Sequence, residues 1–292
     1  MAKGRDLKAP LDITVSIRCV NDPLPQFRDC LAALAKQEGV AFEVFVIDSS
    51  EGDGHAKLCA EFAEFVTHER LEGDTRLNAG RNRGTELANT DLVALTDPDT
   101  IPDPNWLAAL KSELDAGATV TGGKTVPRWI DGTPPWHIRR SSIARTTLAL
   151  MELGDEILPD VGRAFGANMA FSKSAMGEAC HFDLGLDRQG GLLLGGGDTE
   201  FCDKAVANGG RVSYTPHARV QHQLPASRVT SAYFSKKLYW DGVTRSHRGG
   251  APRPVKTKRH LIADCLFLAR YLPAYYRGLR AGKIMDLAKV GS

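Results

Sequence analysis

Short apolar runs alternate with stretches of helical periodicity over the first 115 residues of the chain. The runs are rich in β-branched residues, which is typical of buried strands, and they predict strands at 13–17, 44–47 and 92–96. Between them, apolar residues recur every three or four positions, which predicts helices at 27–34, 56–66, 79–87 and 104–115. Strands that alternate with helices predict an α/β fold, with a mostly parallel sheet flanked by helices on both faces.

The hydrophobic pattern is less regular after residue 115. We expect strands at 118–121, 166–171, 211–214 and 218–220, and helices at 173–180 and 195–207. Residues 127–160 contain two tryptophans and four prolines, and we interpret them as a long excursion that is partly helical at 143–153. From Val229 onward the pattern is helical, apart from a basic, proline-containing linker near 249–255.

Composition excludes several classes of protein. The 292 residues are 42% hydrophobic and 25% charged, which is ordinary for a soluble globular protein. A net charge of +2 gives no general case for nucleic-acid binding. Residues 1–11 read as a disordered tail without the apolar segment of a signal peptide, and no apolar run is long enough to span a membrane. The six cysteines form no Cys-x-x-Cys pair, so we expect reduced, buried thiols and a cytoplasmic protein without a zinc site.

The charge is unevenly distributed near the carboxyl end. Residues 242–263 contain six Lys and Arg but no Asp or Glu. Such a segment is either a solvated stretch or a surface for phosphates, which a substrate or an anionic membrane could supply. The amphipathic stretch Leu261–Leu279 follows it. A peripheral contact with a membrane through this part of the chain is therefore one of the open alternatives.

Two carboxylates follow the predicted strand at 92–96, in the sequence Asp97-Pro98-Asp99. Ligands bind outside the carboxyl ends of strands in open α/β sheets. Two Asp oxygens there suit a hard divalent cation, which in turn can hold a diphosphate. Asp and Pro are also common in solvated turns, so the motif is informative only together with the preceding stretch Arg76–Gly84 and the strand at 92–96.

The first predicted strand leads into the loop 21–25, Asn-Asp-Pro-Leu-Pro, and not into a glycine-rich turn. A dinucleotide dehydrogenase needs glycines at this point to bring backbone close to the pyrophosphate. A nucleotidyltransferase usually has a glycine-rich loop there as well. Both classes are disfavoured.

A series of different short motifs lies between residues 13 and 243. They are Thr14–Ile17, Val46–Ser49, Asn78–Gly84, Leu95–Thr100 with Pro104–Leu107, Gly166–Phe171, Gly195–Phe201 and Val220–His222. In this order they resemble the family 2 inverting glycosyltransferases of the GT-A fold. The resemblance is specific for the fold and for sugar transfer, but not for the sugar or the acceptor.

The resemblance implies roles for four residues around a nucleotide and a metal ion. Asp48 would accept a hydrogen bond from the imide of uracil, and Asp97 would contact the ribose or the water shell of the metal. Asp99 would bind Mn²⁺ or Mg²⁺ directly, with His222 as a further ligand. An Asp that caps a turn and an ordinary loop histidine are the alternatives for Asp48 and His222.

Three further residues would contact the nucleotide-sugar: Asn78, Arg81 and Asn168. Amides and a cation near a helix N-terminus suit an anion. A purely structural role for Arg81 or for the neighbouring Asn82 fits the pattern equally well.

Asp198 is the candidate general base, which would take the proton of an acceptor hydroxyl as that oxygen attacks the anomeric carbon. Three glycines precede it, which indicates backbone close to a ligand, although Asp198 could also be an N-cap. Glu200 is a weaker candidate. The family usually has Glu before this Asp, and Gly197 in its place puts any role of that Glu in doubt.

Trp129, Trp136 and Trp240 are candidates for stacking on sugar rings, and we expect one of them to do so. Processive family members carry a Gln-x-x-Arg-Trp motif and transmembrane helices, whereas this chain has Lys236–Trp240 at the corresponding place. The departure favours addition of a single sugar.

Together these features predict a GT-A catalytic domain at 1–230 and a helical, basic extension at 231–292. Residues 12–115 would bind the nucleotide-sugar, most often UDP-linked, and residues 116–230 would bind the acceptor hydroxyl of a small metabolite, a cell-surface glycan or a lipid-linked precursor. The expected location is the cytoplasm or the inner membrane face. A non-catalytic nucleotide-sugar or glycan-binding protein on the same scaffold is the alternative.

Overall fold

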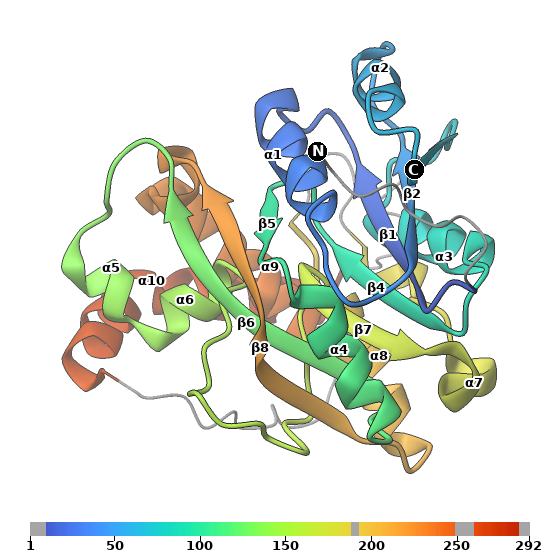
Figure 1. Cartoon of the computed structure of the whole chain (residues 1–292). Helices are drawn as coiled ribbons and strands as arrows, with labels where there is room; N and C mark the ends of the chain where they lie inside the picture. The colour runs from blue at the N-terminus through green and yellow to red at the C-terminus, as the bar shows by residue number, and fades with distance from the viewer. Residues whose placement is uncertain (1–9, 188–192, 249–259, 286–292) are drawn as a thin grey trace.

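An eight-stranded mixed sheet forms the centre of the computed structural model, which describes residues 10–187, 193–248 and 260–285 (Figure 1). The strand order is β3-β2-β1-β4-β7-β6-β8-β5. Its first half consists of the parallel strands β1 (Ile13–Cys19), β2 (Phe42–Asp48), β3 (Val66–Arg70) and β4 (Leu92–Thr96). Because β1 lies between β2 and β4, the strand order reverses there, and ligands bind at such a point in open sheets.

The second half of the sheet brings distant segments to the same edge. It contains β5 (Thr100–Pro102), β6 (Val120–Trp129), β7 (Asn168–Ser172) and β8 (Val212–Leu224). Strand β7 runs antiparallel to both β4 and β6, and β8 pairs in parallel with β6 and antiparallel with β5. The pairing of β5 with β8 places Thr100 opposite His222, so the end of β4 and the end of β8 meet.

Two apolar cores cover the two faces of the sheet, because successive strand residues point to opposite sides. One core joins β1 and β2 to α1 (Leu24–Leu34), α2 (Gly54–Ala60) and α4 (Trp106–Asp115). The other joins β4 and β7 to α7 (Lys173–Met176) and α8 (Gly197–Ala207). Helix α3 (Leu77–Leu87) packs against β1 and β2, and a Cβ at Gly80 would overlap the side chain of Arg18.

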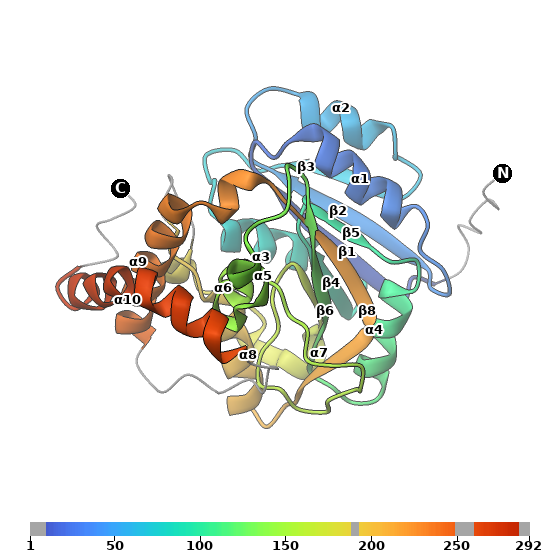
Figure 2. The same ribbon diagram turned by 90° about the vertical axis from the view of Figure 1, so that its left-hand side faces the viewer.

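A third core holds the excursion and the carboxyl-terminal helices together. It joins α5 (Trp136–Arg140) and α6 (Ser142–Thr147) to α9 (Ser231–Arg248) and α10 (Leu261–Gly282). The carboxylate of Asp264 on α10 accepts hydrogen bonds at 2.8 Å from Ser141 Oγ and Ser142 Oγ. Figures 1 and 2 show these four helices together, at the end of the molecule away from α2.

Several elements differ from the sequence-based prediction. The helix expected at 56–66 ends at Ala60, and residues 66–70 form the edge strand β3. The helix expected at 143–153 is the short α6, which ends at Thr147, and Ala149 then adopts a positive φ of 57°. The two strands expected at 211–214 and 218–220 are one strand, β8, which carries an irregularity opposite Gly123 and Lys124.

The remaining expectations concern the surface and the chain ends. All six cysteines are free, but Cys265 is exposed, because it lies on the side of α10 turned away from α9. No helix in the described part of the chain is both long and apolar enough to cross a bilayer. The expected tail at 1–11 and the basic linker at 249–255 lie largely or wholly outside the described residues.

Candidate active site

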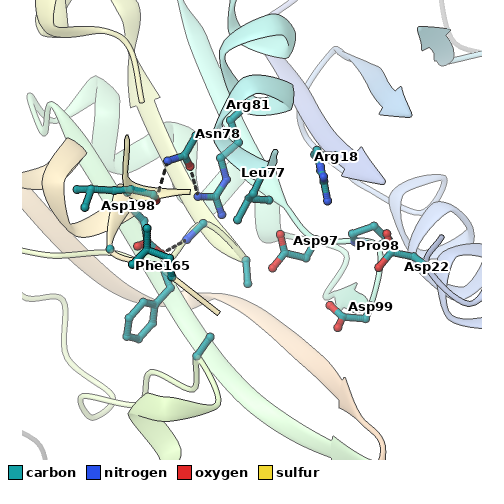
Figure 3. A pocket seen from close by; sticks show the side chains of 18 of the residues that line it. Arg18, Asp22, Leu77, Asn78, Arg81, Asp97, Pro98, Asp99, Phe165 and Asp198 are labelled. Carbon is teal, nitrogen blue, oxygen red and sulfur yellow. Dashed lines mark hydrogen bonds between the residues drawn. The ribbon is translucent and has the colours of Figure 1, made fainter. Parts of the chain in front are cut away.

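A pocket opens at the carboxyl ends of β1 and β4, between the first turns of α3 and α8; we refer to it as the central pocket (Figure 3). Its polar lining consists of Arg18, Asp22, Asn78, Arg81, Asp97, Asp99, Asp198 and Arg228. Figure 3 shows Asp22, Asp97 and Asp99 together with Arg18 on one side and Asp198 on the other, with Arg81 and Leu77 between them. The central pocket therefore has two separate acidic sides.

Asp99 and His222 form a buried pair on the first side. His222 Nε2 lies 3.2 Å from Asp99 Oδ2, and His222 Nδ1 lies 3.1 Å from the carbonyl oxygen of Leu148. Because a carbonyl only accepts, Nδ1 carries a proton and donates it to Leu148, which leaves Nε2 directed at Asp99. Asp99 Oδ1 is buried and has no hydrogen-bond partner among the described residues.

These two residues fit a divalent cation. A carboxylate oxygen and an imidazole nitrogen are ligands that Mn²⁺ accepts, and metal-binding histidines usually donate their other ring proton to a carbonyl or carboxylate. The orphaned Oδ1 of Asp99 supplies the lone pairs that such an ion needs. In the described ranges, no cluster of three His, Cys, Asp or Glu could hold a metal, so substrate or water would complete the coordination.

The guanidinium group of Arg228 lies against this pair. Its Nη1 is 3.3 Å from Asp99 Oδ2 and 3.2 Å from His222 Nε2. Arg228 comes from a 3₁₀ turn, Ala226–Val229, that follows β8 directly. Burial would raise the pKa of Asp99, but His222 and Arg228 outweigh it and lower that pKa. Asp99 is therefore ionised at neutral pH.

Two more charged side chains line the central pocket near the loop after β1. Asp22 accepts a hydrogen bond from the backbone N–H of Val20 at 2.8 Å. Burial raises the pKa of Asp22 to about 6, and the negative charges of Asp99 and Asp97 act in the same direction. Arg18 Nε is buried without a hydrogen-bond partner in the described structure, and burial lowers the pKa of this guanidinium.

Asp198 defines the second side, in the first turn of α8. Its Oδ2 accepts from the backbone N–H of Gly166 at 3.2 Å, and its Oδ1 accepts from the N–H of Thr199 at 3.0 Å. The positive end of the helix and these N–H groups stabilise the carboxylate. The geometry leaves the carboxylate in the lining of the central pocket, where a general base has to be.

Asn78 and Arg81 connect α3 to the loop beneath Asp198. The Asn78 side chain donates to the carbonyl of Asp183 at 2.8 Å, and Arg81 Nη1 donates to Asn78 Oδ1 at 3.4 Å. A Cβ at Gly197 would overlap the Asn78 amide. This contact gives a physical reason for Gly197 where the resemblance leads one to expect Glu.

Two of the residues expected to bind the nucleotide-sugar lie outside the pocket lining. Asp48 is fully buried and accepts hydrogen bonds from Ser50 N at 2.8 Å, His68 Nε2 at 3.0 Å and Arg70 Nη1 at 3.2 Å. Burial would raise the pKa of Asp48, but the bonds from Ser50 and His68 outweigh it and lower that pKa. Asn168 binds Trp106 Nε1 at 2.8 Å, and its amide donates to the carbonyls of residues 124 and 218.

The weaker candidates also lie outside the lining. Glu200 forms an ion pair with Lys204 at 2.9 Å, and Asn82 makes two hydrogen bonds with the backbone of Phe182. Trp129, Trp136 and Trp240 do not line the central pocket, and Trp240 is almost fully buried.

Sequence reasoning missed three of the charged lining residues: Arg18, Asp22 and Arg228. The sequence could have indicated Arg18, since it is the single charged residue in the otherwise buried strand Ile13–Cys19. It could not have indicated Asp22 or Arg228, because only the folded chain brings the loop after β1 and the turn after β8 beside Asp99.

Solved structures with the same fold are glycosyltransferases, although their sequence identity to this chain is low. A mannosyltransferase from Pyrobaculum calidifontis, solved with GDP-Man and Mn²⁺, matches with a TM-score of 0.61 and 19% identity over 97% of this chain and 79% of its own. GalNAc-T7, solved with UDP, GalNAc and Mn²⁺, gives 0.59 and 15% over 90% and 54%. S. aureus TarS 1–349 gives 0.56 and 16% over 90% and 71%. These likenesses confirm the expected GT-A fold.

Sequence comparison identifies the family. A curated relative, the glucosyl-dolichyl phosphate glucuronosyltransferase of Haloferax volcanii, is 25% identical over 173 residues, which are 58% of this chain. The chain spans about half, 54%, of the length of that relative. The model of the family described as glycosyl transferase family 2 matches residues 14–178, more than half of the chain. The chain therefore belongs to glycosyl transferase family 2.

Proposed function

We propose that this chain is an inverting, metal-dependent, non-processive glycosyltransferase that moves one sugar from a nucleoside-diphosphate sugar to an acceptor hydroxyl. The observation that carries the proposal is the separation of the two acidic sides of the central pocket. Asp99 with His222 marks the side for the diphosphate, and Asp198 marks the side for the acceptor. A sugar held between them would be attacked from the face opposite its leaving group, which inverts the anomeric carbon.

The side chains of the central pocket would have different roles in this reaction. Asp198 would accept the proton of the acceptor hydroxyl, and general-base assistance is typically worth about 10²–10⁴ in rate. Arg18 and Arg228 present guanidinium groups to the diphosphate side, where bidentate donors suit phosphate oxygens. A divalent cation held by Asp99 and His222 would neutralise the charge that builds on the departing nucleoside diphosphate.

We keep a UDP-linked donor in the proposal, although the role of Asp48 in binding uracil is its weakest part. Both carboxylate oxygens of Asp48 already accept hydrogen bonds inside the protein. The fold also accommodates other nucleotides, since one solved relative holds GDP-Man and another holds UDP. For the acceptor, the name of the curated relative makes a lipid-linked precursor the first class to test.

Thermal unfolding against UDP, GDP and TDP, each with and without Mn²⁺, tests the donor side. A ligand at about 100 times its Kd stabilises by roughly 2.7 kcal/mol, which is readily measured. We expect a shift with UDP that needs Mn²⁺ and disappears in Asp99→Asn. The matched control Asp103→Asn, at the residue directly after β5 and paired with Arg219, should keep the shift. A shift with GDP or TDP alone would overturn the uracil assignment but keep the class of reaction.

Asp198→Asn tests the base and separates the enzyme from a non-catalytic binding protein. We expect nucleotide binding to be retained and kcat to fall about 10²–10⁴-fold. Glu200→Gln is the matched control, since this acid lies two positions along α8 outside the pocket lining and should keep its activity. Unchanged transfer by Asp198→Asn would refute the base assignment. A wild-type chain that binds nucleotide but transfers and hydrolyses no sugar would favour the binding protein.

A further inference from the structure

Helix α10 is apolar on the side that faces solvent as well as on the side that faces the protein. Its inner side packs Phe267 and Tyr271 into the third core. On the outside, Leu261 is 71% exposed, Ile262 65%, Leu266 48% and Tyr276 54%. A group of large apolar side chains on the outer side of a helix is normally covered by a partner or a membrane. The outward side of α10 is therefore a surface that lacks its cover in the isolated chain.

An exposed tryptophan extends this surface onto α5. Trp136 is 46% exposed, and its ring meets that of His260, the N-cap residue of α10, at 5.8 Å. We call Trp136, Leu261, Ile262, Leu266 and Tyr276 the α10 face. Exposed aromatic and aliphatic side chains grouped on neighbouring helices usually mark an interaction site.

The exposed charges on α5 and α10 all have one sign. Five exposed cations flank the α10 face on α5 and at the end of α10: Arg139, Arg140, Arg277, Arg280 and Lys283. The only acidic residue in α5 and α10 is Asp264, which is buried and bonded to the two serines of the α6 start. A positive rim around an apolar centre complements a surface that is anionic outside and apolar inside.

We propose that the α10 face docks on an anionic lipid bilayer. Amphipathic helices with apolar residues and flanking Lys and Arg lie in the interface of such membranes. A second copy of the chain is a poorer occupant, because a two-fold contact would bring each arginine cluster near its own image. Anionic headgroups instead pair with the cations while the acyl region covers the apolar side chains.

Docking would fix the orientation of the central pocket relative to the bilayer, because the same packed unit holds both. Leu148, whose carbonyl binds His222, lies in the core that contains Phe267. On α9, Thr244 accepts from the N–H of Gly195 at 3.3 Å, three residues before Asp198. The inference does not rest on the proposed function, since binding to lipid is measured without donor or acceptor.

Co-sedimentation of the full chain with vesicles tests the inference. We expect binding to vesicles of mixed phosphatidylcholine and phosphatidylglycerol, and little binding to phosphatidylcholine alone. Arg277→Gln with Arg280→Gln should weaken binding about fivefold for each cation removed at low salt. Ile262→Ser with Leu266→Ser should weaken it on the order of tenfold, because two apolar side chains no longer enter the interface.

The matched control removes an exposed apolar residue and an exposed cation from the opposite end of the molecule. Leu24→Ser with Lys36→Gln, at α1 and just after it, should bind as the wild type does. Thermal unfolding shows whether each variant is folded, and all exchanged side chains are exposed. A wild-type chain that binds neither vesicle overturns the inference. So does a wild-type dimer that Ile262→Ser with Leu266→Ser converts to a monomer.

Discussion

Five charged side chains share the diphosphate side of the central pocket, and the pKa values of two of its carboxyl groups shift in opposite directions. Burial raises the pKa of Asp22 to about 6, whereas the pKa of Asp99 is low because His222 and Arg228 lie beside it. Within the described residues, Asp22 forms no ion pair, and its carboxylate accepts a hydrogen bond from Val20 N–H. At neutral pH the folded chain thus holds a poorly compensated carboxylate that the unfolded chain hydrates freely.

Asp22→Asn should therefore stabilise the metal-free protein at neutral pH. The folded-state pKa of Asp22, about 6, lies above its ordinary value of 3.8, so the folded state binds more protons between these two values. Stability from this group is full below pH 3.8 and is lost as pH rises through about 6. Two units correspond to roughly 3 kcal/mol at most. Asparagine keeps an acceptor for Val20 N–H.

Urea unfolding of both proteins between pH 4.5 and pH 8 measures this difference. We expect the variant to be more stable than the wild type by about 1–3 kcal/mol at pH 8, with a smaller gap at pH 4.5. A gap that does not change across this range would show that Asp22 does not titrate differently in the two states.

At the scale of elements, the start of α8 is shaped by its contact with α3. The Gly197 Cα lies so close to the Asn78 amide that any side chain would overlap it. Gly197→Ala should cost about 1–3 kcal/mol, as for other overpacked sites. Gly195→Ala is the matched control in the same loop, since the nearest atom, Lys237 Nζ, is 3.9 Å from the added Cβ.

Combining Gly197→Ala with Asn78→Ala shows whether the clash is the cause. Removing the amide makes room for the new methyl group, so the double variant should lose less stability than the two single variants together. Chemical unfolding of the four proteins gives the coupling energy. Strict additivity would mean that the loss of stability in Gly197→Ala has a cause other than the contact with Asn78.

The same elements show how far sequence reasoning reaches. Strands with β-branched alternation were predicted nearly in full, as for Ile13–Cys19. Strand β5 was missed because three residues that end in Pro102 have no periodicity, and they are a strand only through pairing with β8. The sequence predicts two strands, at 211–214 and 218–220, but the structure has one strand that passes Pro216 with an irregularity and continues to Leu224.

The candidate site follows the same rule. Asp97, Asp99, Asp198 and His222 were predicted because each belongs to a local motif, and the structure brings Asp99 together with His222 and places Asp97 and Asp198 in the central pocket. Arg228 could not be predicted, because its contact with Asp99 spans 129 positions and depends on how β8 pairs with β5. Residues in local motifs can be predicted from the sequence. The pairing of charges in the central pocket cannot, because it depends on the tertiary fold.

At the scale of the whole molecule, the division of the chain into a catalytic domain at 1–230 and a helical extension at 231–292 remains a proposal. The packing indicates that the two parts fold together. Residues before the boundary, such as Ile138, Leu150 and Leu224, are buried against Phe234 and Phe267 beyond it. The Asp264 carboxylate adds hydrogen bonds across the same contact.

A chain that ends at residue 230 should therefore fail to fold. It would expose Ile138, Leu148, Leu150 and Leu224, and each fully buried side chain of this kind is worth about 1.5–3 kcal/mol. The sum, roughly 6–12 kcal/mol, is comparable to the whole stability of a typical domain, about 5–15 kcal/mol. A chain that ends at residue 285 keeps every described contact and is the matched control. Circular dichroism and thermal unfolding of both compare them directly. If the chain that ends at 230 unfolds cooperatively at the same temperature as the full-length chain, the expectation is wrong. The packing of α9 and α10 against Leu148 would then be dispensable for the fold.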